Sequence, residues 1–167
     1  MKKVILFALV LAVHGVLLNS VLAQEVPRYL VTYVRSQNVG PIWSATAVTV
    51  TNQSSKESCI VQVEWFQSDP VISQCILEVE MAPGVTRHFC SRRLPADITS
   101  CSPVATPATC PALFGSQGTA IVSSTARFEC SLIAVDARVY YTTPSDAAIS
   151  AISNSKVVFF SEGNLGD

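Results

Sequence analysis

The sequence predicts an all-β fold, an antiparallel β-sandwich of seven or eight strands that is held together by disulfides. Apolar and polar residues alternate in short runs instead of recurring every three or four positions. Turn-forming residues separate these runs at short intervals. The chain also carries an even number of cysteines, six. Repeated alternation is typical of strands that bury one face and expose the other, which favours an antiparallel sandwich.

The first residues of the chain predict a signal peptide. Two lysines precede an apolar run over residues 4–13, and small side chains lie just before Gln24. This order is typical of a signal that is cleaved after Ala23. The apolar stretch is shorter than the roughly 20 residues that a membrane-spanning helix needs. We therefore expect residues 1–23 to be removed and residues 24–167 to form one domain, secreted or periplasmic.

The expected strands follow from runs of alternating residues. In the clearest run Val61, Val63 and Trp65 share one face, while Gln62 and Glu64 occupy the other. The sequence Ala-Pro-Gly at 82–84 predicts a turn, because proline fixes φ and glycine accepts a positive φ. The expected strands cover 30–34, 45–51, 59–65, 75–81, 85–89, 119–123, 131–141 and 156–160.

The segment from Ser91 to Gln117 interrupts the alternation. It contains four prolines, which lack the donor that a sheet ladder needs, so most of it is expected to be a loop. A loop of about 27 residues within a compact domain is either functional or a crossover between sheets. Both interpretations stay open for 91–117.

Six cysteines follow the predicted cleavage site. In an exported domain an even number predicts disulfides, here three. No C-x₂-C pair is present, so we expect neither a metal site nor a cofactor. The cysteines are Cys59, Cys75, Cys90, Cys101, Cys110 and Cys130.

The pairing can be predicted only in part. Cys59 and Cys75 are in phase with the buried residues of their strands, and a hairpin folded near residue 67 would bring them together. The preferred set is Cys59–Cys75, Cys101–Cys110 and Cys90–Cys130, and the alternative for the last two is Cys90–Cys101 with Cys110–Cys130.

The charge balance argues against two classes of partner. Removing two lysines with the signal leaves 9 basic residues (11 − 2) against 12 acidic ones, a net charge of about −3. The only adjacent basic pair that remains is Arg92-Arg93. We therefore expect no nucleic-acid partner and no anionic membrane partner.

Candidate catalytic residues are few. His88 is the only histidine after residue 23, and it lies on a predicted strand. Glu64, Glu78 and Glu80 share the outward phase of neighbouring strands, which is the usual place for solvated carboxylates. We therefore expect no catalytic residue, and a small secreted hydrolase using these carboxylates is an alternative.

Two sets of residues are candidates for binding. Asp136, Arg138 and Tyr140 lie on one face of a late strand, and Arg and Tyr are frequent at protein interfaces. The competing interpretation is a surface ion pair beside an aromatic ring. A carbohydrate-binding module is the other alternative, with aromatic platforms among Trp43, Trp65, Tyr140 and Tyr141.

Four segments resemble a known group of proteins: 45–54, 77–89 with its Ala-Pro-Gly turn, 118–123 and 133–140. Their rhythm is similar to the immunoglobulin-like or fibronectin-III-like sandwiches of uncharacterised bacterial secreted proteins. The chain departs from antibody domains because Trp65 follows Cys59 by only six residues. The resemblance implies a binding or structural role by analogy. The expected function is a non-catalytic secreted module for protein interaction or for cell-envelope or extracellular assembly.

Overall fold

The computed structural model describes residues 28–39, 42–67, 73–94, 99–106, 109–110, 116–124, 133–142 and 149–160, so the predicted signal at 1–23 lies outside it. These residues form strands joined by turns and loops, without any helix that could cross a membrane. The predicted all-β class is confirmed. The strands are β1 (Arg28–Val39), β2 (Ile42–Asn52), β3 (Cys59–Gln67), β4 (Ser73–Met81), β5 (Thr86–Cys90), β6 (Cys101–Val104), β7 (Ser116–Ser124), β8 (Ile133–Thr142), β9 (Ile149–Asn154) and β10 (Val157–Phe160).

The predicted number of seven or eight strands is wrong, since the described residues contain ten. The two unexpected strands are β6 and β9. β6 lies inside the segment expected to be a loop and contains Pro103, which is tolerated because β6 is at an edge of the sheet. β9 pairs with β8 alone, and its small and polar residues give a weak strand signal.

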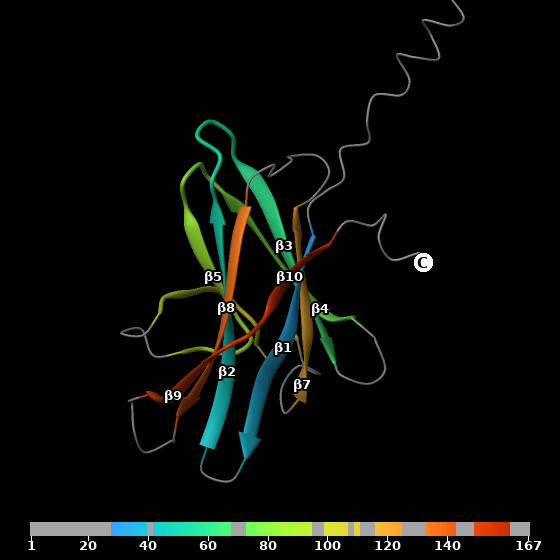
Figure 1. Cartoon of the computed structure of the whole chain (residues 1–167), viewed down its shortest axis with the longest axis vertical. Coiled ribbons are helices and arrows are strands. Elements are labelled where there is room, and N and C mark those ends of the chain that lie inside the picture. Colours follow the sequence, from blue (N-terminus) through green and yellow to red (C-terminus); the bar gives the residue numbers. More distant parts are fainter. Residues whose placement is uncertain are drawn as a thin grey trace, which may run out of the picture.

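The strands form one hydrogen-bonded sheet with two arms. The main path is β4-β3-β7-β1-β2-β5-β6, while β10 pairs with β1, β8 with β2 and β9 with β8. We call β4, β3, β7, β1 and β10 arm A, and β9, β8, β2, β5 and β6 arm B. The pairing is antiparallel except between β5 and β6. The arms meet where residues 36–39 of β1 pair with 42–45 of β2 (Figure 1).

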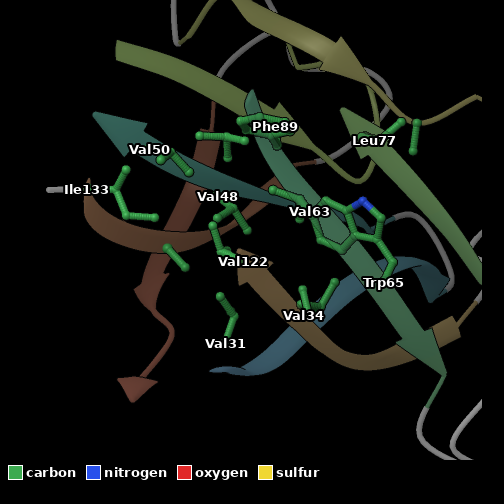
Figure 2. Packing of buried hydrophobic residues seen from close by; sticks show 14 of the residues in the cluster. Val31, Val34, Val48, Val50, Val63, Trp65, Leu77, Phe89, Val122 and Ile133 are labelled. Carbon is green, nitrogen blue, oxygen red and sulfur yellow. The ribbon is translucent and has the colours of Figure 1, made fainter. Parts of the chain in front are cut away.

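The two arms enclose a shared hydrophobic core. Alternate residues of β3, including Val63 and Trp65, point from arm A toward Val48 and Phe89 of arm B (Figure 2). All four side chains are completely buried. Burying a side chain of this size contributes about 1.5–3 kcal/mol, so this core is the main source of stability.

β1 changes partners along one edge, and hydroxyl side chains fill the gap. Residues 28–31 pair with β10 and residues 36–39 pair with β2. Between them the Ser155 hydroxyl donates to the Tyr33 carbonyl at 2.7 Å and accepts from the Tyr33 amide at 3.2 Å. The Arg35 amide donates to Thr46 Oγ1 and the Ser91 hydroxyl donates to the Arg35 carbonyl, both at 2.7 Å. These contacts satisfy backbone groups that no strand reaches.

The preferred Cys59–Cys75 pairing is wrong. The β3–β4 register places Cys59 opposite Met81 and Cys75 opposite Trp65. The two cysteines therefore lie six residues apart along the hairpin, about 20 Å at the rise of a strand. The error arose because this register centres the hairpin near residue 70 instead of 67.

Two disulfides are described, and one connects the two ends of the sheet. Cys75 on β4 bonds to Cys110, which follows β6, so the bond joins the first strand of the path to the segment after the last. Cys90 bonds to Cys101 and links the neighbouring strands β5 and β6, as the alternative set predicted. The pairings Cys101–Cys110, Cys90–Cys130 and Cys110–Cys130 are therefore wrong. Cys59 is also disulfide-bonded, and Cys130, the remaining cysteine, lies outside the described residues.

Candidate functional site

The residues predicted as an interaction surface do not share one exposed surface. Asp136 and Arg138 are about half exposed and form an ion pair, with 3.1 Å between Arg138 Nε and Asp136 Oδ2. Tyr140 is only 7% exposed, because it is covered by Leu94 and the Cys90–Cys101 disulfide. An exposed ion pair of this kind contributes about 0.2–1 kcal/mol. The structure therefore leaves Asp136 and Arg138 on the surface and places Tyr140 in a second, smaller core.

The described parts of the 91–117 segment pack against both arms. Leu94 lies on the outer side of arm B, where it covers Tyr140. Ala105 and Cys110 are buried in the main core. In these parts the segment serves to cover the sheet and connect its ends.

The candidate catalytic residues are spread over the two arms. His88 on β5 is half-buried, and its Nδ1 lies 3.0 Å from Thr49 Oγ1. Burial lowers the pKa of His88 below its ordinary value of 6.5. The carboxylates Glu64, Glu78 and Glu80 lie on β3 and β4 of the other arm. Among the described residues no group of three or more metal-ligating side chains could hold an ion.

Two of the proposed sugar platforms are hidden inside the protein. Trp65 is fully buried in the main core and Tyr140 is nearly so. Trp43 is half-buried, and the Arg92 guanidinium lies 5.4 Å from the centre of its ring. A cation over the ring occupies the face that a sugar would use.

Arg35 is held between two tyrosine rings. Its guanidinium carbon lies 5.4 Å from the centre of the Tyr33 ring and 5.8 Å from that of Tyr141. Burial raises the pKa of Tyr33, and the nearby Arg35 charge acts in the opposite direction. Arg35 Nε is buried and has no hydrogen-bond partner among the described residues. These contacts therefore hold Tyr33, Arg35 and Tyr141 together near the place where β1 diverges from β2, and the Arg35 guanidinium covers the Tyr141 ring.

A row of mostly apolar side chains crosses the outer face of arm A. This face is the one that points away from the core. The strand registers place Val158 opposite Leu30, Leu30 opposite Ile121, Ile121 opposite Glu64 and Glu64 opposite Ile76. We call these five residues, on β10, β1, β7, β3 and β4, the outer row. Ile76 is 50% exposed and the other four are half-buried. Four of the five side chains are apolar, on a face where an antiparallel sheet with one buried face usually carries polar residues.

The row was not predicted from the sequence, because the apolar residues of each strand were assigned to its inward phase. A signal was present in three places where consecutive apolar residues occupy both phases: 75–77, 120–122 and 157–159. In a strand two such neighbours must point to opposite faces. One residue of each such pair must therefore lie outside the core.

Three carboxylates lie on the outer face of arm A beside the row. Glu64 belongs to the row itself, and Glu78 and Glu80 follow Ile76 in the same phase of β4. Glu78 and Glu80 are exposed, and none of the three forms an ion pair with another described residue. Arg28 lies in the same phase of β1 as Leu30, and the exposed Lys156 precedes Val158 by two residues, so the basic residues near this face lie at its β1–β10 end. The β3–β4 end of the face is therefore acidic.

A small hollow lies at the same end. It has a volume of about 140 Å³ and is lined by Ser58, Cys59, Ile60 and Glu80. Sites for drug-sized ligands measure about 300–1,000 Å³. The hollow therefore fits a side chain or a few water molecules better than a substrate.

The comparisons with known proteins assign no family to this chain. No family model matches, and no curated protein matches. Among solved structures, the crystal structure of Thermotoga maritima 1070 resembles this chain, with a TM-score of 0.44 and 11% identity, over 84% of this chain and 94% of that one. At this TM-score and identity the likeness supports no conclusion about function.

Proposed function

We propose that this protein is an exported, non-catalytic module of immunoglobulin-like sandwich type that binds a protein partner through the outer face of arm A. The observation that carries the proposal is the outer row, which ends at the half-exposed Ile76. Exposed apolar side chains grouped on one face are typical of interaction sites. The sheet beneath them is held in place by its core and by disulfides, so binding costs little conformational entropy.

Export is supported by two independent features. The described disulfides require an oxidising compartment, such as the periplasm or the extracellular space. The N-terminal sequence has the form of a signal cleaved after Ala23. A partner would then be found in the cell envelope or outside the cell.

The proposal can be tested by photo-crosslinking in the source cells. A photoreactive amino acid is placed at Ile76 on arm A or, as a matched control, at Ile152 on arm B, which is 55% exposed. We expect a discrete crosslinked product from position 76 and none of the same mass from position 152. Adding Ile121→Asp, which puts a charge in the middle of the row, should remove the product.

The folded state of each variant is checked by its circular-dichroism melting curve. If position 76 gives no product in well-folded protein, or if both positions give the same products, the outer face of arm A is not the binding site. A product that persists in folded Ile121→Asp protein would also contradict the proposal.

A further inference from the structure

We infer that the partner of this face is an extended protein segment whose residues at every second position, which face the sheet, are first apolar and then lysine or arginine. The inference rests on the proposed function and adds the chemistry of the partner. Ile76, Glu78 and Glu80 project from one face of β4 at every second residue, which spaces them about 6.6 Å apart. Basic side chains at every second position of an extended segment have the same spacing.

The charges on the face select a basic partner. Within the part of the chain that the structure describes, Glu64, Glu78 and Glu80 form no ion pair, so a basic segment would neutralise charges that these residues leave uncompensated. Each exposed pair contributes only about 0.2–1 kcal/mol. Burial of Ile76 and Ile121 would therefore supply most of the affinity, and the carboxylates would set the specificity.

The same charges disfavour two other occupants. An acidic segment would place like charges against Glu78 and Glu80. A second copy bound by twofold symmetry would bring the same patch from both subunits together, so six carboxylates would enter one interface. In the described part of this face the basic residues, Arg28 and Lys156, lie on or beside β1 and β10, at the end opposite Glu78 and Glu80.

Two synthetic nine-residue peptides provide the test. Both carry serine at the four even positions and valine at positions 1 and 3, and positions 5, 7 and 9 are lysine in one peptide and glutamate in the other. Binding to the oxidised protein is measured by fluorescence anisotropy at low salt and in 1 M NaCl. The variant is Glu78→Gln/Glu80→Gln, and the control is Glu57→Gln, an exposed acid in the β2–β3 connection.

We expect the lysine peptide to bind at least tenfold more tightly than the glutamate peptide. The double variant should lose about three- to tenfold in affinity for the lysine peptide, whereas Glu57→Gln should lose less than twofold. High salt should remove most of the difference, because the Debye length falls to about 3 Å at 1 M.

The inference is overturned if the lysine peptide fails to bind, or if both peptides bind equally. It is also overturned if sedimentation velocity finds a dimer that Ile121→Asp dissociates, since the occupant would then be a second copy. If these results are negative while Ile76 still crosslinks in cells, the interaction function stands and only the basic character of the partner is wrong. Loss of the crosslink as well would remove the function itself.

Discussion

Gly118 shows how closely the strands approach one another around β7. It lies opposite Val34 of β1 and Gln67 of β3, at the start of the central strand of arm A. A Cβ atom added there would overlap the carbonyl oxygen of Phe66, which is backbone and cannot move aside without shifting β3. No side chain larger than hydrogen fits at this position.

We therefore expect Gly118→Ala to lower the free energy of unfolding by more than about 2 kcal/mol. The matched variant is Gly84→Ala in the 82–84 turn. There φ is +71° but no atom lies within 4 Å of the added Cβ, so the expected loss is about 1 kcal/mol. Urea denaturation of both proteins measures the difference. Equal losses, or a smaller loss at position 118, would show that the strands are farther apart than described.

The point where β1 passes from arm A to arm B depends on small hydroxyl side chains. Ser91 and Ser155 are almost fully buried, and each hydrogen-bonds to backbone groups of β1. Sequence alone gave no sign of this role, because serine in a chain rich in serine and threonine is expected at the surface. Only the register of β2 and β10 on β1 shows which backbone groups lack a strand partner.

Replacing Ser155 by alanine removes the hydroxyl that donates to the Tyr33 carbonyl. Replacing Ser91 leaves the buried Thr46 amide without its acceptor, while Thr46 Oγ1 still donates to the Arg35 carbonyl at 3.3 Å. We expect Ser91→Ala and Ser155→Ala each to cost about 1–3 kcal/mol of unfolding free energy. Ser102→Ala, at an exposed position of β6, is the control and should cost less than about 0.5 kcal/mol. Equal midpoints of urea unfolding for all three variants would mean that the hydroxyls are not needed at the crossing.

Strand elements were predictable where alternation was strict. β3 and the inward face of β4 follow the predicted phase, because Val61, Val63 and Leu77 are all buried. The turn at 82–84 was also predictable, and Gly84 does adopt a positive φ. The register of the β3–β4 hairpin was not, since the length of its turn is not encoded in the alternation, and the wrong disulfide prediction followed from that shift. The outer row was missed for a related reason: its members are adjacent only after five strands are aligned.

At the scale of the whole molecule, the Cys75–Cys110 bond closes an otherwise open path of strands. It joins β4 to the segment after β6 and spans 35 residues, whereas Cys90–Cys101 spans 11 and joins strands that already pair. The entropy lost by the unfolded chain predicts about 4 kcal/mol for the longer loop and about 3 kcal/mol for the shorter one. The bond that connects the ends of the sheet should therefore matter more.

We expect Cys75→Ala/Cys110→Ala to be less stable than Cys90→Ala/Cys101→Ala. The difference should be about 1 kcal/mol, or more because Cys110 is packed in the main core and Ala leaves a cavity there. Thermal unfolding under oxidising conditions, with each remaining disulfide verified by mass, makes the comparison. A lower melting temperature for the Cys90/Cys101 variant would contradict this role of the closing bond.

Mass spectrometry of the protein recovered from its source tests whether the chain is exported and whether disulfides close its sheet. Peptide mapping without reductant should find Gln24 at the N-terminus, Cys75 joined to Cys110 and Cys90 joined to Cys101. The third bond should join Cys59 to Cys130, and the intact mass should be six hydrogens lighter than that of the reduced chain. A chain that still begins at Met1 and carries free thiols would contradict both the export and the closed fold.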